Sequence, residues 1–456
     1  MKKVWLCFGF MLLSALAVST AQADMSQGEL RLQAMEEKVD SLSATDNKVN
    51  YNTHKVSTTN DVRLSYGSKG FRLETGNGLF QTNLAWRAQM RFTGLEEGDP
   101  RRMGDFGPDD DVHTFETRRV RMKIGGHGYK PWIKYYFEVD LQPMADCCGG
   151  DQSRDSRTRV IDWRIDVQPW EWFGIRVGQW KINYNRERVD SSGKQQFVER
   201  SIVNRQFTID RQIGVMAQGH LFKGTLADMR YYAGVFNGEG KGVYNPDDNF
   251  MYMGRIQWNF LGRDLKWKQS DVSRHKKPTG SLAFAAAQNN GVCTRWSSSG
   301  CGNLDEFTDE GAAAPEQFNI RQYVQEFAFK WNGLSIQEEY HWKRVHDTGQ
   351  QYIRYMEGAY AQVGYFFNEL VSFVPPQLEV AFRYAFVDEP DTNFDPYGNT
   401  PHYQNHRNEF TGAINWFVAD HNNKITVDAS LLTLDNNRTG FEDEEARVRV
   451  QWDITF

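Results

Sequence analysis

The chain has 456 residues and a formal net charge of −6, with 40% hydrophobic and 14% aromatic residues. This acidic balance argues against a nucleic-acid partner, because nucleic acids bind basic surfaces. Beyond the first apolar stretch, no segment approaches the roughly 18 uninterrupted apolar residues of a spanning helix, which excludes a helical membrane protein.

The first 23 residues are typical of a secretory signal peptide. Lys2 and Lys3 form its charged start, an apolar stretch runs from Val4 to Val18, and Ala21–Ala23 has the small residues of a cleavage site. A retained membrane anchor is the alternative, but the apolar stretch is short for a spanning helix. Cleavage before Asp24 removes two lysines, so the formal net charge of the exported chain changes from −6 to −8.

Residues 24–57 carry apolar side chains at spacings of three and four. This spacing predicts a periplasmic helical or coiled-coil segment of about two good heptads. Such a segment would form either an oligomer stalk or a loosely ordered helical leader, and at this length both interpretations stay open. The apolar positions are Leu32, Met35, Val39, Leu42, Val49 and Val56.

From residue 79 onward, apolar and polar residues alternate with the period of a β-strand. In one stretch Val120, Met122 and Ile124 oppose Arg119, Arg121 and Lys123. Sixteen such stretches occur, and each has roughly the length of a strand that crosses an outer membrane. After four stretches within 79–167, the others lie near 172–181, 210–221, 225–237, 250–261, 280–289, 320–331, 333–345, 353–368, 377–388, 408–418, 424–434 and 445–456.

The connections between these stretches alternate between long and short, apart from a short one at 346–352 and a long one at 262–279. Long loops at one end and short turns at the other are typical of bacterial outer-membrane barrels. We therefore predict an all-β fold, a 16-stranded antiparallel transmembrane β-barrel over residues 79–456, in the outer membrane of a Gram-negative bacterium. The final RVRVQWDITF is expected to close the barrel, with its apolar face toward lipid.

Four cysteines remain after the signal peptide, and all lie in loop-like segments. Cys293 and Cys301 could form a disulfide in an oxidising compartment. Cys147 and Cys148 could pair with each other or remain free. A zinc site is the weaker alternative, because no histidine stands at a matching spacing.

Several stretches of the predicted barrel carry a family resemblance. They are FETRRVRMKIGGHGYKPWIKYYFEVDL, GIRVGQWKINYNRERVDSS followed by FVERS, RQIGVMAQG, and EGAYAQVGYFF with QLEVAFRYAFVD. In these stretches the chain resembles the phosphate-selective porins of the O and P type. The resemblance implies a 16-stranded barrel, a homotrimer, and a third long loop, residues 182–209, folded into the pore as a constriction.

The resemblance also implies anion-binding residues. Two adjacent arginines of the family are matched by Arg118 and Arg119, a constriction-loop lysine by Arg188, and a loop arginine after a glutamate by Arg200. The alternation of the strands also places Arg121 and Lys123 on the inner wall of the barrel. Segment 182–209 holds five basic and three acidic side chains. The predicted pore-lining set is Arg118, Arg119, Arg121, Lys123, Arg186, Arg188 and Arg200, and the alternative for each residue is an ion pair with a neighbouring carboxylate.

These residues predict a passive diffusion channel for small anions, with phosphate or polyphosphate implied by the resemblance. A general or sugar-admitting porin is the alternative within transport, and a structural or adhesin barrel is the alternative from another class. No GxSxG, HExxH or paired-carboxylate motif is present, so we predict no enzyme activity, no metal site and no cofactor. The expected partners are small solutes, outer-membrane lipid and two further copies of the chain.

Overall fold

The computed structural model describes residues 61–456 except 97, 102, 107–110, 142–157, 299, 305–306, 308–312, 390–404 and 438. The predicted signal peptide, the predicted helical segment 24–57, Cys147 and Cys148 lie outside the described residues. Within the part of the chain that is described, no helix is long and apolar enough to cross a membrane.

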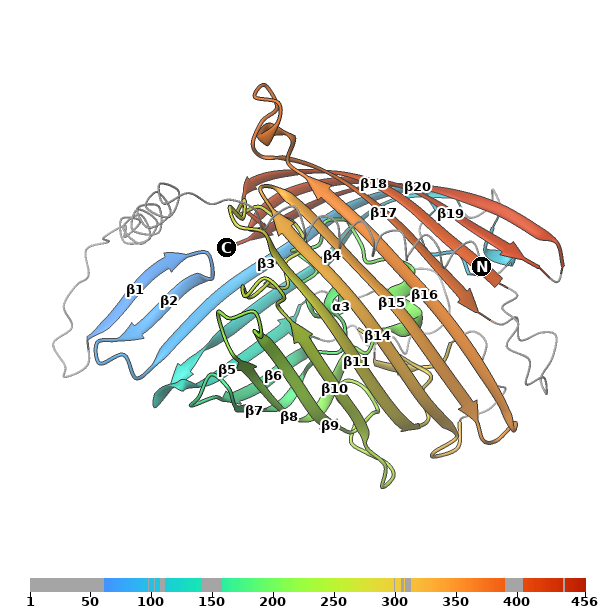
Figure 1. The fold of residues 1–456 in the computed structure, drawn as a ribbon, viewed down its shortest axis with the longest axis horizontal. Coiled ribbons are helices and arrows are strands. Elements are labelled where there is room, and N and C mark those ends of the chain that lie inside the picture. The colour runs from blue at the N-terminus through green and yellow to red at the C-terminus, as the bar shows by residue number, and fades with distance from the viewer. Residues whose placement is uncertain are drawn as a thin grey trace. The chain divides into compact units, whose positions relative to one another are not determined.

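Sixteen antiparallel strands form a closed ring (Figure 1). Each pairs with the next along the chain, and β20 pairs with β3 from Arg447↔Leu95 to Thr455↔Arg87, which closes the ring. The predicted all-β, 16-stranded antiparallel barrel is confirmed. The strands are β3 (Gln81–Glu96), β4 (Asp111–Gly128), β5 (Lys130–Asp140), β6 (Arg159–Val167), β7 (Gly174–Lys181), β8 (Arg211–Leu221), β9 (Met229–Phe236), β10 (Met251–Trp258), β11 (Thr279–Gly291), β14 (Phe318–Trp331), β15 (Leu334–Asp347), β16 (Tyr352–Tyr365), β17 (Leu378–Glu389), β18 (Asn405–Ala419), β19 (Asn423–Asn436) and β20 (Phe441–Thr455).

The two faces of the ring follow the alternation of the sequence. On β20, Trp452 on the outer face is 42% exposed, whereas Gln451 and Asp453 on the inner face are each 1% exposed. The same contrast separates Trp86 from Arg87 on β3. The outer face is therefore apolar and accessible, and the inner face carries buried polar and charged groups, as expected of a barrel whose outside meets lipid.

Short turns gather at one end of the barrel. Asn332 and Gly333 join β14 to β15 with φ angles of +47° and +85°, the backbone of a tight hairpin turn that asparagine and glycine adopt most readily. Residues 420–422 join β18 to β19. We call this end the turn end, and the opposite end the loop end.

A hairpin precedes the ring and was not part of the predicted barrel. It consists of β1 (Val62–Gly67) and β2 (Gly70–Thr75), and β2 pairs with the first residues of β3, from Phe71↔Leu84 to Glu74↔Gln81. The C-terminal Phe456 exchanges backbone hydrogen bonds with Trp86, immediately beyond this pairing. Strand β3 therefore bonds to β20 along most of its length and to β2 at its start.

Three segments fold into the ring. The constriction segment, residues 182–210, carries the short helices α3 (Arg186–Val189) and α4 (Val203–Phe207), and Figure 1 shows α3 inside the strands. Residues 259–278 enter from the turn end. The described residues among 292–317 enter from the loop end and carry β12 (Arg295–Ser297) and β13 (Gly300–Gly302). Cys293 and Cys301 form a disulfide, with their Cα atoms 5.5 Å apart. Single-turn 3-10 helices lie at η1 (Met103–Asp105) and η4 (Phe367–Glu369).

Candidate functional site

Carboxylates of the barrel wall hold the constriction segment in place. The segment has no strand ladder to satisfy its backbone, so its N–H groups need other acceptors. Four of these groups donate to carboxylate oxygens on β14, β15, β18 and β19. The bonds are Arg186 N to Glu326 Oε1 (3.2 Å), Glu187 N to Glu339 Oε1 (2.6 Å), Ile202 N to Glu409 Oε2 (2.9 Å) and Val198 N to Asp428 Oδ2 (2.9 Å). The acidic residues of this wall are thus used to fix the segment.

Arg188 and Arg200, both predicted to line the pore, are buried within the constriction segment. Arg188 is 6% exposed and forms an ion pair with Asp210. Arg200 donates to the carbonyl oxygens of Glu187 (2.9 Å) and Asp190 (2.7 Å). Burial, with the charge of Arg188 adding to it, lowers the pKa of Arg200 to about 10. Both guanidinium groups tie parts of the segment together.

Arg186 is directed toward Lys266 and Trp267 of the segment that enters from the turn end. It is 1% exposed, donates to the carbonyl oxygen of Lys266 (2.9 Å), and lies over the ring of Trp267 at 5.1 Å. It joins the constriction segment to the segment that enters from the turn end. The bonds of these three loop arginines thus go to groups of the constriction segment and of the segment that enters from the turn end.

We expect Arg188→Glu to loosen the constriction segment, because it would place a second carboxylate beside the buried Asp210. Breaking a buried ion pair costs about 3–5 kcal/mol. The variant should show new thermolysin cleavage within residues 182–210 and larger fluctuations of single-channel current. Arg188→Lys, which keeps the charge, is the control and should restore most of the protection. Unchanged cleavage in Arg188→Glu would contradict the anchoring role.

Arg118 and Arg119 gather around one carboxylate of the constriction segment. Together with Arg91, they place three guanidinium groups within 3.2 Å of Glu199 Oε1. Burial alone would raise the pKa of Glu199, but Arg119, Arg91 and Arg118 hold it well below its usual value. This cluster ties strands β3 and β4 to the segment.

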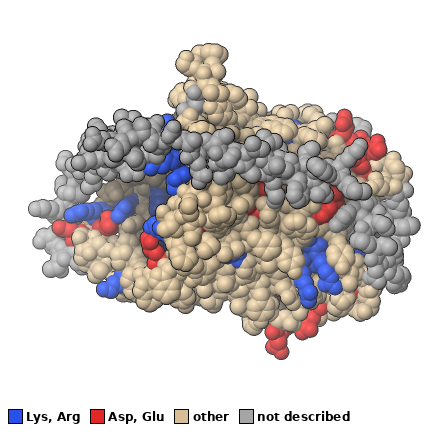
Figure 2. Space-filling model, in the orientation of Figure 1, with Lys and Arg blue, Asp and Glu red and all other residues tan. Residues whose placement is uncertain are grey.

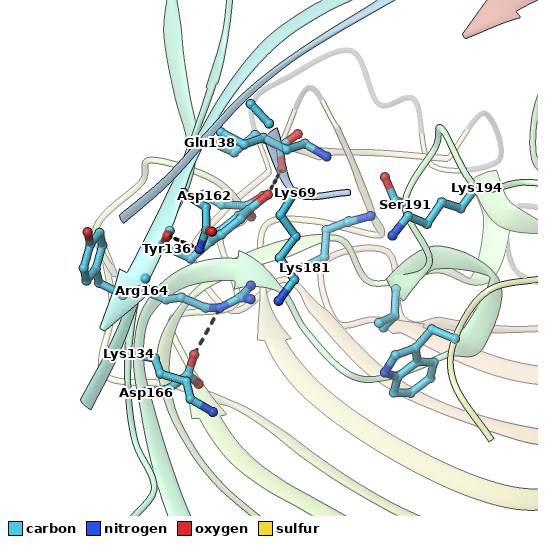
Figure 3. Close-up of a pocket in the computed structure, with 18 of the residues that line it drawn as sticks. Lys69, Lys134, Tyr136, Glu138, Asp162, Arg164, Asp166, Lys181, Ser191 and Lys194 are labelled. Atoms are coloured by element: carbon cyan, nitrogen blue, oxygen red, sulfur yellow. Dashed lines mark hydrogen bonds and ion pairs between the residues drawn. The ribbon is translucent and has the colours of Figure 1, made fainter. Parts of the chain in front are cut away.

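A cavity of about 890 Å³ runs from the constriction segment to the turn end along the wall of β3–β9. Side chains of the wall, the hairpin turn and the constriction segment converge on it, among them Lys69, Lys134, Lys181 and Lys194 (Figure 3). Figure 2 shows lysine and arginine side chains gathered around a hollow at the left of the view. The rest of the ring is filled largely by the buried segments described above.

The cavity is strongly basic although the whole chain is acidic. Eleven lysines and arginines line it against three carboxylates, which leaves a formal excess of eight positive charges. The carboxylates are Glu138, Asp162 and Asp166. The basic residues are Lys69, Arg87, Arg121, Lys123, Lys134, Arg164, Arg176, Lys181, Lys194, Arg211 and Arg230.

Some of these cations are neutralised by neighbours. Arg211 makes two hydrogen bonds of 3.0 Å to Asp162. Arg164 (3.4 Å) and Arg176 (2.5 Å) share Asp166. In the same way Arg121 donates to Glu138 (3.1 Å) and Asp140 (3.1 Å). The three carboxylates of the cavity are thus all engaged.

Other cations of the cavity have no carboxylate partner within the described residues. Arg87 donates to the hydroxyls of Ser191 (3.0 Å) and Ser192 (2.6 Å) on the constriction segment. Lysines 69, 123, 134 and 194 make no ion pair in that part of the chain. Burial lowers the pKa of Lys194. Arg87 and these four lysines therefore offer positive charge to a solute in the cavity.

Of the seven predicted residues, Arg121 and Lys123 line this cavity. The alternation also predicts Arg87 and Lys134 on the inner face, and both line the cavity although neither is in the predicted pore-lining set. The alternation does not place Lys181 and Arg211 on the inner face. They have the parity of the outward residues Ile175, Val177 and Val215, yet they pair with each other and line the cavity. Gly178, with φ +128°, interrupts the pleat before Lys181.

Comparisons with known proteins agree on the fold. A family model described as phosphate-selective porin O and P matches residues 98–454. OmpT of Vibrio cholerae, folded in vitro, is 8% identical with a TM-score of 0.52, over 83% of this chain and 98% of that chain. OmpF of Salmonella typhi, in complex with daunomycin, is 12% identical with a TM-score of 0.51, over 83% and 99%. The channel DcaP of Acinetobacter baumannii is 13% identical with a TM-score of 0.49, over 84% and 99%. No curated protein sequence matches the chain.

Proposed function

Because this chain belongs to the phosphate-selective porin O and P family and is an outer-membrane barrel, we propose that it is a passive channel for small anions. In the outer membrane the turn end faces the periplasm, since short turns are periplasmic in such barrels. The cavity then forms the periplasmic half of the solute pathway, below the constriction segment.

The formal excess of eight positive charges in the cavity carries this proposal. A partly dehydrated ion responds to charges at short range, so a cavity of one sign favours ions of the other sign. The acidic excess of the chain does not oppose this, because acidic wall residues such as Glu339 and Asp428 do not line the cavity. The solute meets the basic side of the barrel.

Phosphate is the anion that the unpaired groups fit best. The guanidinium group of Arg87 is a planar fork that matches two oxygens of one phosphate. The hydroxyls of Ser191 and Ser192 beside it are further donors. Lys123 and Lys194 line the same cavity and add positive charge to it. We therefore propose phosphate or polyphosphate as the solute. We also propose that the protein is the homotrimer that the family resemblance implies. Light scattering of the detergent-solubilised protein would measure its mass and so test the trimer.

The direct test is the reversal potential of the native protein in a planar bilayer under a potassium chloride gradient. We expect its sign to show preference for chloride, and we expect added phosphate to reduce the chloride current. A preference for potassium would reject the anion channel.

A general, sugar-admitting porin is the second candidate, and aromatic rings in the cavity favour it. Tyr135, Tyr136, Tyr232 and Trp267 line the same space as the cations, and such rings can stack on sugar faces. Current block by a neutral disaccharide, without block by phosphate, would select this candidate.

A further inference from the structure

His421 is a buried histidine with no hydrogen-bond partner for its ring. It lies in the turn between β18 and β19, its side chain is 1% exposed, and it lines the cavity. Neither ring nitrogen has a partner within the described residues. Asp420 Oδ1 is 3.9 Å from Nε2, too far for a hydrogen bond, and already accepts the backbone N–H of His421 (2.7 Å). Buried polar groups are rarely left unpaired, so a ligand in the cavity is the natural partner.

The charges that face His421 are nearly all positive. Burial, followed by four lysines from four different elements, holds the pKa of His421 well below its usual value. Asp420, the carboxylate next to His421 in the turn, is 51% exposed and lies 3.4 Å from Lys268. On the remaining side the ring of Phe417 meets the imidazole edge-on at 5.3 Å. The four lysines are Lys424 on β19, Lys268 in the turn-end segment, Lys194 in the constriction segment and Lys330 on β14.

Lys194 and Lys69 line the same cavity as His421. Lys194 lines the cavity without an ion pair within the described residues. Asn422 donates to the carbonyl oxygen of Ser68 (3.2 Å), which holds the β1–β2 turn, and Lys69 with it, at the same end of the cavity. Lys424 is instead occupied by the carbonyl oxygen of Gln195.

We propose that His421, Lys194 and Lys69 form a binding subsite for a doubly charged oxyanion at the turn end of the cavity, and that the anion binds together with one proton. The proton comes from solvent and adds to a ring nitrogen of His421, which then donates a hydrogen bond to an anion oxygen. An N–H bond forms on His421 as an O–H bond of hydronium breaks, and the anion itself undergoes no covalent change. This subsite rests on the proposed anion channel and adds to it a dependence on pH.

The sign of this dependence follows from the charges. Without the anion, His421 is neutral at neutral pH because its pKa lies well below 6.5. A bound dianion favours the charged ring and raises that pKa. Anion affinity is therefore constant above the bound-state pKa, rises as the pH falls through it, and levels off below the anion-free pKa. Each unit between the two pKa values is about a tenfold change in affinity.

Sulfate is the probe, because it stays doubly charged over the pH range in which phosphate itself titrates. We would measure the sulfate concentration that halves single-channel chloride current between pH 8 and pH 4.5. The native protein should need about tenfold less sulfate at the acidic limit. His421→Gln should lose this change, and Lys194→Gln should weaken block at every pH. His127→Gln is the matched control, because His127 also lines the cavity but already contacts the carbonyl oxygen of Gly78 (2.9 Å).

A second measurement covers the case in which His421→Gln does not fold. In ¹³C-histidine-labelled native protein, sulfate should raise the pKa of one ring resonance, assigned as the one missing from His421→Asn. If the native channel is anion-selective but sulfate block does not change with pH, or changes equally in His421→Gln, the subsite is overturned and the anion channel stands. If the native channel prefers cations, the proposed function itself fails.

Discussion

Deletion of residues 441–456 is expected to abolish the folded barrel. These residues form β20, which pairs with β19 from Asn423↔Ile454 to Asn436↔Phe441 and with β3 through nine residue pairs. Without β20, the facing edges of β19 and β3 carry unpaired N–H and C=O groups in lipid, and each such group costs several kcal/mol. The heat-modifiable band of the folded protein on gels should disappear.

A matched control removes strands that do not close the ring. Deletion of residues 62–75 takes away β1 and β2, which pair with the ring through Phe71–Glu74 at the start of β3 and contact it again where Asn422 donates to the carbonyl oxygen of Ser68. This variant should keep the heat-modifiable band. A folded, inserted protein lacking residues 441–456 would contradict the role of β20 as the closing strand.

Charge reversal at two unpaired wall lysines is expected to have the largest effect on permeation. Lys123→Glu with Lys134→Glu changes the formal excess in the cavity from eight positive charges to four. If each reversal contributes about 1 kcal/mol, the anion-to-cation permeability ratio falls by roughly thirtyfold, since about 1.4 kcal/mol is a factor of ten. Reversal potentials under a potassium chloride gradient measure this ratio.

The control for this variant makes the same charge change outside the cavity. Lys276→Glu with Lys277→Glu alters two lysines of the turn-end segment that do not line the cavity. We expect a much smaller shift of reversal potential. Equal shifts in the two double variants would mean that the overall charge of the protein, and not the cavity, sets the ion preference.

The strand pattern could be predicted from sequence because one physical constraint acts on every strand. Lipid outside and polar groups inside impose a period of two, so the sequence already assigns Trp452 and Asp453 to opposite faces.

The β1–β2 hairpin also has a recognisable sequence pattern. In VRLSYGSKGFRLET, alternating residues flank a Gly-Ser-Lys-Gly turn, but the stretches are short and lie before the resemblance begins.

The arginines of the constriction segment could not be placed by the same logic. Arg186, Arg188 and Arg200 lie outside any ladder, so no period fixes where their side chains point. Their directions depend on acceptors distant in sequence, such as the carbonyl oxygen of Lys266 for Arg186. A positive charge in a loop sequence therefore predicts an ion contact without distinguishing a solute from a structural partner.

The β1–β2 hairpin also protects the barrel from other chains. Strand β3 begins at Gln81, six residues before Arg87, where its pairing with β20 starts, so a closed ring alone would leave unpaired backbone groups at Gln81–Leu84. Exposed strand edges of this kind are templates for intermolecular pairing and aggregation. Strand β2 pairs with these residues of β3, and the six-residue β1, which carries Arg63, becomes the outer edge instead. A short, charged edge is a poor template, so the hairpin shields the site of closure from strand exchange with neighbouring unfolded chains while the barrel assembles.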